Sequence, residues 1–279
     1  MKVLKALRYA QEILSQIENK EYAKWEALLI LSHLLNTSPL KVYLYLDKEI
    51  PEGNFLKILE ERKNKKPLPY ILKEAYFWGR KFYIEEGVLI PRQETEVLIS
   101  IFLKLPLKKG KILELGVGAG IIGITFLLEN SNLEVFGVDI SLKALKITKK
   151  NAIDYGVEDR LFLIKGDWLY PFLERPLFNV IVSNPPYISF SEWDTLDEEV
   201  KLFEPKGALL AGKEGTEFQE SLLKFAYKYL KKDGFLIFEI GYNQGKRIKE
   251  MLKFYKWKFE IYKDLKGYDR VVLAWKENM

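Results

Sequence analysis

Cysteine is absent from this sequence, and histidine occurs once, at His33. Without cysteine the chain can form neither a disulfide framework nor a cysteine zinc site, and it has no thiol nucleophile. A single histidine cannot build a metal site with several histidine ligands, and its place in an apolar helical stretch favours a structural role. We therefore expect no metal. The lack of cysteine agrees with a reducing cytosol, so we expect a cytoplasmic protein.

Long apolar runs are also missing. Residues 27–35 form an apolar stretch that is too short to span a membrane. Near the N-terminus, apolar residues recur at helical spacing, which predicts an amphipathic helix rather than a signal peptide. Nearly half of the chain is nevertheless hydrophobic, at 48%, so a packed core is expected. The net charge of +5 is mild, and solubility accounts for it as well as an acidic or nucleic-acid-bearing partner would.

Residues 1–66 are expected to form a small helical domain. Apolar periodicity predicts helices near residues 3–17 and 21–35, and prolines at 39 and 51 are typical of further helix starts. The charged run at residues 60–66 is typical of a solvated helix end. Residues 67–90 then change character: β-forming residues on both sides of Gly79, from Tyr70 to Ile84, predict a hairpin linker between two domains.

Strands and helices alternate over residues 91–279, which we expect to form one α/β domain. The expected strands are residues 111–115, 133–139, 161–164, 180–184, 234–240, 256–263 and 270–275, and the expected helices are residues 93–105, 119–129, 142–155, 215–230 and 244–254. Such alternation predicts a mostly parallel sheet with helices on both faces. Only a few residues around Gly267 separate the last two strands, so these should pair antiparallel.

A glycine-rich turn follows the first strand of this domain, at Gly116, Val117, Gly118, Ala119 and Gly120. Glycine removes Cβ atoms, so the backbone can approach a ligand closely, and the helix N-terminus offers free N–H groups. In dinucleotide enzymes this place binds pyrophosphate. The spacing here is G-x-G-x-G rather than G-x-G-x-x-G, and the glycines alone do not identify the ligand.

The ends of the next two strands add nucleoside-binding features. Asp139 ends the second strand, 139 − 116 = 23 positions after the first glycine, where a carboxylate can accept hydrogen bonds from both ribose hydroxyls. Asp167 and Trp168 follow the third strand and can bind an adenine amino group and pack on its ring. A tight turn with two surface acids is the structural alternative. Three such features in register favour a nucleoside site.

The fourth strand leads into Asn184-Pro185-Pro186-Tyr187. The prolines stiffen the backbone and leave carbonyl acceptors without N–H donors, Asn184 adds a side-chain acceptor, and Tyr187 offers an aromatic wall. Two acceptors can hold a planar amide-type nitrogen with its lone pair toward a methyl donor, so that catalysis comes from positioning. A rigid turn is the structural alternative. This motif and Glu114 before the glycines favour S-adenosylmethionine over NAD.

Further segments resemble the HemK/PrmC family of protein-(glutamine-N5) methyltransferases, and the resemblance covers nearly the whole chain. It is carried by Asn184-Pro185-Pro186-Tyr187 and by four segments, at residues 67–71 with 77–79, 88–96, 203–215 and 264–270. One departure is Glu239-Ile240-Gly241, where many relatives carry a polar or basic middle residue; we expect little effect on chemistry. For Arg92 and Glu94, a role in shaping the pocket and a plain ion pair at a helix start stay equally open.

The resemblance implies a seven-stranded Rossmann-like class I methyltransferase domain behind the small all-α N-terminal domain. It implies methylation of the glutamine in the Gly-Gly-Gln motif of class-I peptide chain release factors, with S-adenosylmethionine as cofactor and S-adenosylhomocysteine as product. The helical domain would help to bind the release factor. Residues 116–120, Asp139, Asp167, Trp168 and Asn184 would contact the cofactor. Asn184 and the Pro185 carbonyl would bind the glutamine amide, with Pro186 and Tyr187 beside it.

Three other functions are weighed against this one. A glutamine methyltransferase of a ribosomal protein would share nearly every motif. An amino methyltransferase of a DNA or RNA base would need an aromatic clamp and a basic strand-binding module; Tyr187 and Phe190 could stack a base, but the N-terminal helices show no nucleic-acid motif. We expect no stable nucleic-acid partner and no membrane. A catalytically inactive binding module conflicts with the intact glycines, Asp139 and Asn184.

Overall fold

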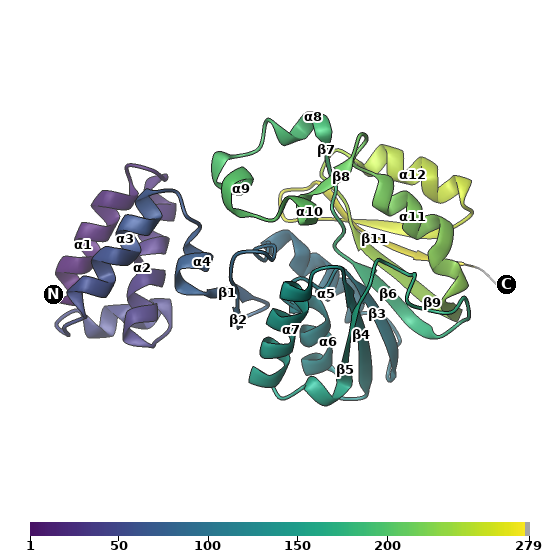
Figure 1. Cartoon of the computed structure of the whole chain (residues 1–279), viewed down its shortest axis with the longest axis horizontal. Helices are drawn as coiled ribbons and strands as arrows, with labels where there is room; N and C mark the ends of the chain where they lie inside the picture. Colours follow the sequence, from purple (N-terminus) through teal and green to yellow (C-terminus); the bar gives the residue numbers. More distant parts are fainter. Residues whose placement is uncertain (277–279) are drawn as a thin grey trace. The chain divides into compact units, whose positions relative to one another are not determined.

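The computed structural model describes residues 1–276 and divides into two compact units, Met1–Glu74 and a second that begins at Ala75 (Figure 1). The expected boundary at residue 66 thus lies before the end of the first unit. Among the helices of the described residues, none combines the length and apolar character needed to cross a bilayer.

The first unit is a helical bundle, as the apolar periodicity predicts. Its elements are α1 (Val3–Leu14), α2 (Lys20–Leu35), the 3₁₀ helix η1 (Pro39–Tyr45), α3 (Glu52–Lys63) and α4 (Leu68–Leu72). Asn19 caps α2 by accepting a hydrogen bond from the Tyr22 N–H over 2.9 Å, and Asn36 ends that helix in the left-handed region at φ 49°. α1 ends at Leu14 rather than at residue 17, and Pro39 opens a 3₁₀ helix.

A buried ion cluster links two helices of this bundle. Arg62 of α3 is 2% exposed and donates to both carboxylate oxygens of Glu26 on α2, over 2.9 and 3.0 Å. A second nitrogen of Arg62 donates to Glu18 over 2.6 Å. Arg62 belongs to the charged run that the sequence assigns to a solvated helix end, and here that assignment is wrong. The residue's i, i+3 and i+4 relation to Leu59 and Ile58 places it on the buried face.

The expected hairpin is shorter than the sequence indicates. Its strands are β1 (Glu74–Phe77) and β2 (Arg80–Tyr83), whereas Tyr70 and Ile71, expected to be extended, lie in α4. Pro67 and Pro69 favour a helix start there, which outweighs the β preference of the residues that follow. The hairpin belongs to the second unit, where Asn151 accepts from the Tyr83 N–H and donates to the Tyr83 carbonyl, over 2.8 and 3.0 Å.

A seven-stranded sheet forms the centre of the second unit, in the order β10-β11-β9-β6-β3-β4-β5 (Figure 1). The strands are β3 (Gly110–Leu115), β4 (Leu133–Asp139), β5 (Leu161–Lys165), β6 (Phe178–Ser183), β9 (Leu230–Glu239), β10 (Lys258–Lys263) and β11 (Asp269–Trp275). β5, β4, β3, β6 and β9 pair in parallel, and β11 pairs antiparallel with both β9 and β10. The fold class and the antiparallel last pair are confirmed.

Helices cover the two faces of this sheet (Figure 1). They are α5 (Glu96–Phe102) after η2 (Gln93–Thr95), α6 (Ile121–Glu129), α7 (Leu142–Asp154) with η3 (Glu158–Arg160) after it, α11 (Glu217–Phe225) with η4 (Ala226–Lys228), and α12 (Gly245–Phe254). The central strands are buried on both sides: Val180, Ile181 and Val182 of β6 are each 0% exposed. Such continuous burial is typical of parallel strands between helix layers.

The segment after β6 contains short elements that periodicity does not predict. They are β7 (Ile188–Ser189), α8 (Phe190–Trp193), α9 (Glu198–Phe203), α10 (Lys206–Leu209) and β8 (Leu210–Gly212). β7 pairs in parallel with β8 outside the main sheet. Ser189 and Glu192 form a reciprocal cap at the start of α8, which orders this segment where it leaves Tyr187.

The Arg62 cluster yields a stability prediction. We expect Glu26→Ala to lower the free energy of unfolding of the first unit by about 3 kcal/mol, because it leaves the buried guanidinium without its two-oxygen partner. Glu12→Ala, an exposed carboxylate on α1, should change it by less than about 0.5 kcal/mol. Denaturant unfolding of the full chain measures both, and equal effects of the two substitutions would contradict the prediction.

Candidate functional site

One cavity of about 450 Å³ lies at the carboxyl ends of the parallel strands. Loops after β3, β4, β5 and β6 line it, as expected for an open α/β sheet. Of the residues singled out in the sequence, these line the cavity: Gly116, Val117, Gly118, Ala119, Asp139, Asp167, Trp168, Asn184, Pro185 and Pro186. Gly120 and Tyr187 are not part of its wall. The structure therefore brings four separate sequence motifs to one place.

Two of the glycines leave the cavity wall open. Gly116 and Gly118 have φ of +74° and +55°, and a Cβ built on either would meet no atom within 4 Å. The backbone of this turn is thus bare toward the cavity, as a ligand that packs on main-chain atoms requires. Gly120 differs, because a Cβ there would lie 2.6 Å from Thr148 Cγ2. Its place is explained by close packing of the turn against α7.

Asp139 holds the glycine turn in shape. One carboxylate oxygen accepts from the Gly118 N–H over 3.0 Å, and the other accepts from the Ser141 N–H over 2.8 Å. Burial raises the pKa of Asp139. Each carboxylate oxygen can accept more than one hydrogen bond, so both can also receive the hydroxyls of a ribose.

Trp168 forms an aromatic wall with a residue that the sequence does not reveal. Its ring stacks on Phe218 of α11, with centroids 4.8 Å apart and planes at 20°, and both rings line the cavity. Trp168 has a positive φ of 47°, uncommon for an aromatic residue. Phe218 comes 50 positions after Trp168, and nothing in the local sequence pattern connects the two.

Glu114 is bonded to the first turn of α6, the helix that follows the glycine turn, and does not line the cavity. It is 1% exposed, and its Oε2 accepts from the Gly123 N–H of α6 over 3.0 Å. Its Oε1 has no hydrogen-bond partner among the described residues. Burial raises the pKa of Glu114 to about 8. At pH 7 the carboxyl group is therefore mostly neutral, which explains how the side chain of Glu114 can be buried without a charged partner.

Asn184 is tied to two residues that the sequence analysis missed. Its Nδ2 donates to Thr95 Oγ1 over 3.2 Å, and the Thr95 hydroxyl donates to Glu239 Oε2 over 2.7 Å. The Tyr187 hydroxyl donates to the other oxygen of Glu239 over 3.3 Å. Thr95 and Glu239 are both 0% exposed. Thr95 lies inside the 88–96 segment and Glu239 in the Glu239-Ile240-Gly241 departure, but their chemical link appears only in three dimensions.

Burial sets the ionisation of this group of residues. It raises the pKa of Glu239 to about 7, with a further contribution from the Glu94 charge, while Thr95, Arg270 and Tyr187 act in the opposite direction. Burial and the neighbouring Glu239 carboxylate raise the pKa of Tyr187, so its hydroxyl keeps its hydrogen and remains a donor.

Gln244 clamps the backbone beyond Tyr187. Its Nε2 donates to the carbonyls of Tyr187 and Gly215, over 2.9 and 2.8 Å, and its Oε1 accepts from the Gly241 N–H over 2.9 Å. A Cβ on Gly215 would lie 2.8 Å from the Tyr187 carbonyl oxygen. Gly215 ends the 203–215 segment of the family resemblance, and its role is to let the two backbones approach.

Arg92 and Glu94 have different surroundings. Arg92 lines the cavity and also donates to the buried Glu204 over 2.5 Å. Its position is therefore compatible with both roles considered for it, shaping the pocket and forming an ion pair. Glu204 also accepts from the Ile90 N–H over 3.3 Å. Glu94 does not line the cavity and pairs with Lys266 over 3.1 Å.

The groups that line the cavity fit a nucleoside cofactor. No group of three His, Cys, Asp or Glu residues able to hold a metal ion occurs within residues 1–276. The bare glycine turn, the Asp139 carboxylate and the Trp168 ring offer main-chain, ribose and base contacts in one cavity. The acceptors of Asn184 and Pro185 lie in the same wall, where a second, nitrogen-bearing reactant can be held.

Comparisons with known proteins agree with this arrangement. Residues 5–72 match the PrmC N-terminal domain, and residues 92–211 match the methyltransferase small domain. A release factor glutamine methyltransferase of Aquifex aeolicus is 41% identical, covering 95% of this chain and 94% of the relative. One from Bacillus anthracis is 35% identical over 98% of this chain and 99% of its own. A Pyrococcus furiosus methyltransferase structure matches with a TM-score of 0.54 at 18% identity, covering 81% of this chain and 98% of that one, which supports the fold.

The close approach at Gly215 gives a second prediction. Gly215→Ala forces an alanine into the left-handed region and brings its Cβ against the Tyr187 carbonyl oxygen. Gly156→Ala imposes the same kind of backbone strain, at φ +65°, but its Cβ would meet open space. Gly215→Ala should therefore destabilise the second unit more than Gly156→Ala. The φ contribution alone is about 1–2 kcal/mol. Denaturant unfolding of the two variants measures the additional loss of stability caused by the contact with the Tyr187 carbonyl. Equal losses in the two variants would show that the close approach of the two backbones is unimportant for stability.

Proposed function

This chain belongs to the release factor glutamine methyltransferase family, and we propose that it transfers the methyl group of S-adenosylmethionine to the side-chain amide N5 of a glutamine in a class-I peptide chain release factor. The chain is a methyltransferase by its domain and its relatives. The glutamine of the Gly-Gly-Gln motif is the proposed acceptor.

One observation supports this assignment most strongly. Asn184 and Pro185 line the same cavity as the glycine turn and Asp139, so acceptors for a planar nitrogen stand beside the nucleoside-type wall. The Nδ2 of Asn184 is engaged by Thr95, which leaves Oδ1 for the reactant. Proline at 185 and 186 supplies carbonyls without competing N–H donors.

Catalysis in this proposal is mainly positioning. The Asn184 Oδ1 and the Pro185 carbonyl each accept one N–H of the glutamine amide, which turns the nitrogen lone pair toward the methyl donor. S-adenosylmethionine, when bound, supplies a methyl carbon whose bond to the sulfonium sulfur breaks as the new bond to nitrogen forms, leaving S-adenosylhomocysteine. The nitrogen then loses one proton to water, so no strong base has to act before the transfer. Tyr187, expected from the sequence to lie beside the amide, stands outside the cavity wall and would hold the turn through its hydrogen bond to Glu239.

The cofactor contacts are assigned by the same reasoning. The main chain of residues 116–119 would face the amino-acid part of the cofactor, Asp139 the ribose hydroxyls, Asp167 the adenine amino group and Trp168 the adenine ring, while Gly120 lies outside the cavity wall. Val117 and Ala119 also line this wall, and Asn184, which lines it as well, would border both reactants. These roles follow from residue chemistry and from placement in one cavity.

The remaining assignments complete the proposal. The first unit, Met1–Glu74, would help to recognise the release factor, and the second unit, which begins at Ala75, would carry the catalytic site. We propose a cytoplasmic enzyme with no membrane association and no stable nucleic-acid partner. A ribosomal-protein glutamine and a DNA or RNA base amino group are the alternative substrates.

Labelled S-adenosylmethionine distinguishes these substrates. Purified enzyme is offered a class-I release factor, the same factor with its Gly-Gly-Gln glutamine changed to alanine, a ribosomal protein, and DNA. Label should appear on the first only. Label on DNA or on the ribosomal protein, with none on the release factor, would overturn the proposed substrate.

Removal of the Asn184 acceptor should abolish most turnover. Asn184→Ala is expected to lower kcat by on the order of 100-fold, because the amide nitrogen loses one of the two acceptors that orient it. Thermal unfolding should stay close to that of the unsubstituted chain. Asn132→Ala, an exposed asparagine just before the amino end of β4, is the matched control and should keep full turnover. Unchanged kcat in Asn184→Ala would refute the acceptor role.

Asp139→Ala should act on the cofactor instead. Loss of the ribose acceptor and of its support for the glycine turn should raise the Kd of S-adenosylmethionine about 10- to 100-fold, by analogy with the loss of one or two charged hydrogen bonds. Isothermal titration calorimetry measures this directly. The exposed Asp159→Ala serves as the control. An unchanged Kd would remove Asp139 from the ribose site.

A further inference from the structure

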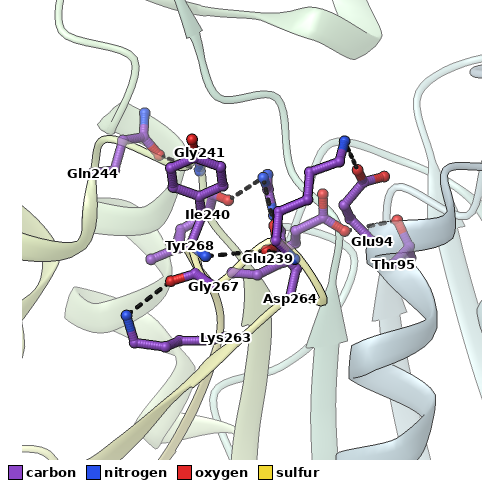
Figure 2. A network of polar contacts seen from close by, with 12 residues as sticks. Glu94, Thr95, Glu239, Ile240, Gly241, Gln244, Lys263, Asp264, Gly267 and Tyr268 are labelled. Atoms are coloured by element: carbon purple, nitrogen blue, oxygen red, sulfur yellow. Dashed lines mark hydrogen bonds and ion pairs between the residues drawn. The ribbon is translucent and has the colours of Figure 1, made fainter.

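A hydrogen-bonded chain leads from the cavity to a carboxylate that the proposed reaction does not otherwise use. Asn184 Nδ2 donates to Thr95 Oγ1, and the Thr95 hydroxyl donates to Glu239 Oε2. Figure 2 shows the last step, with the Thr95 side chain directed at the Glu239 carboxylate from a neighbouring segment. Because Thr95 and Glu239 are fully buried, these groups must satisfy one another rather than exchange partners with water.

The chemistry of these groups fixes the direction of every hydrogen bond in the chain. An ionised carboxylate has no hydrogen to donate, so the single hydroxyl hydrogen of Thr95 is committed to Glu239. The Thr95 oxygen can then only accept. Of the two ends of the Asn184 carboxamide, only the NH₂ end can donate to it. Oδ1 is therefore the end left to face the reactant.

We propose that Glu239 is a positioning residue for the methyl transfer. Its ionised carboxylate can only accept hydrogen bonds, so it sets the direction of the Thr95 hydroxyl. The Thr95 hydroxyl in turn sets the orientation of the Asn184 carboxamide. This inference rests on the proposed function, because the acceptor it orients is the one that holds the glutamine amide. Glu239 touches neither reactant and acts through Thr95.

A second contact ties the same carboxylate to the other end of the motif. The Tyr187 hydroxyl donates to Glu239 Oε1 over 3.3 Å, while Thr95 occupies Oε2. One carboxylate thus anchors both the first and the last residue of Asn184-Pro185-Pro186-Tyr187. Two prolines separate these anchors and restrict the backbone between them, so a change at Glu239 affects the orientation of the whole turn.

Protonation of Glu239 removes the direction that it imposes. A neutral carboxyl group can donate to Thr95, which frees the Thr95 hydrogen to point at Asn184 and permits the carboxamide to turn over. The NH₂ end would then oppose the N–H bonds of the substrate amide. Activity should therefore fall as pH decreases through the pKa of Glu239, which burial raises to about 7.

The charged groups around Glu239 come from three neighbouring elements. Arg270 of β11 favours the carboxylate, and Glu94 of η2 opposes it; the Tyr187 hydroxyl, after β6, donates to it. Arg270 is itself held by Asp264 over 3.1 Å, and Glu94 by Lys266 over 3.1 Å. Arg270 and Glu94 therefore influence the ionisation of Glu239 in opposite directions, and both lie outside the cavity wall.

Glu239→Gln keeps the size of the side chain but adds a donor. We expect kcat on the release factor to fall by on the order of 100-fold through misorientation of Asn184. The KM for release factor and the Kd of S-adenosylmethionine should each change by less than about twofold, and the acidic limb of the kcat profile near pH 7 should disappear. Wild-type kcat with an unchanged pH profile would overturn the proposal.

Thr95 variants test the relay itself and leave Glu239 in place. Thr95→Ser keeps the hydroxyl and should retain most turnover, whereas the near-isosteric Thr95→Val should lose as much as Glu239→Gln. The double variant should lose no more than either single one, since both break the same chain. Full turnover in Thr95→Val would refute the relay, and this holds even where Glu239→Gln fails to fold.

Glu94→Gln is the matched control for the pH effect. Removal of this negative charge lowers the pKa of Glu239, so the acidic limb should move to lower pH while the plateau kcat stays unchanged. A limb that stays in place would mean that Glu239 does not produce it.

A spectroscopic readout separates failure of the inference from failure of the proposed function. In full-length protein labelled with ¹³C at glutamate carboxyls, the resonances of the buried Glu114 and Glu239 should titrate near neutral pH, and the one that titrates near pH 7 should be missing in Glu239→Gln, without cofactor or substrate. If unsubstituted enzyme leaves the release factor unlabelled, the proposed function fails whatever this titration shows. If unsubstituted enzyme is active and no such resonance exists, the inference fails alone.

Discussion

Parallel pairing of β5, β4, β3 and β6 brings the carboxyl ends of four strands to one edge of the sheet, and the chemistry of this protein depends on that alignment. Gly116, Asp139, Asp167 and Asn184 each lie at or just after the carboxyl end of one of these strands, although 68 positions separate the first from the last. A register shift in any pair would move its loop out of the common cavity. The buried, β-branched centre of β6 helps to prevent this by fixing that strand between two layers of helices.

Much of this arrangement could be predicted because it depends on local sequence patterns. Period-3.6 and continuous apolar runs locate the main helices and strands, and the short link at Gly267 predicts the antiparallel pair. The β preference of Tyr70 and Ile71 predicted the wrong structure, because nearby prolines favour a helix there. The charge of Arg62 indicated exposure to solvent, but two carboxylates compensate that charge inside the bundle. The elements between β7 and β8 are too short to show periodicity.

The residues that could not be predicted act through partners distant in the chain. Thr95 and Glu239 are 144 positions apart, and each alone resembles an ordinary helix-start threonine or strand-end acid. The role of Phe218 in the cavity wall is likewise visible only in the folded protein, where α11 packs beside Trp168. Local motifs identify groups that bind reactants directly, whereas groups that orient them are defined by tertiary contacts. Gly215 lies between these cases, since the family resemblance marked its segment and the structure supplied the reason.

The insertion of β11 between β9 and β10 has a consequence for how the chain acquires its site. β11 follows all other strands in sequence, yet it pairs with β9, and its Arg270 donates to the Ile240 carbonyl over 3.2 Å. The sheet is therefore closed by its latest segment, and the surroundings of Glu239 form only then. Non-local pairing of this kind slows folding, while the local contacts of the helical unit form early during synthesis. Nascent chains that lack β11 would expose β9 as an apolar sheet edge, a template for aggregation.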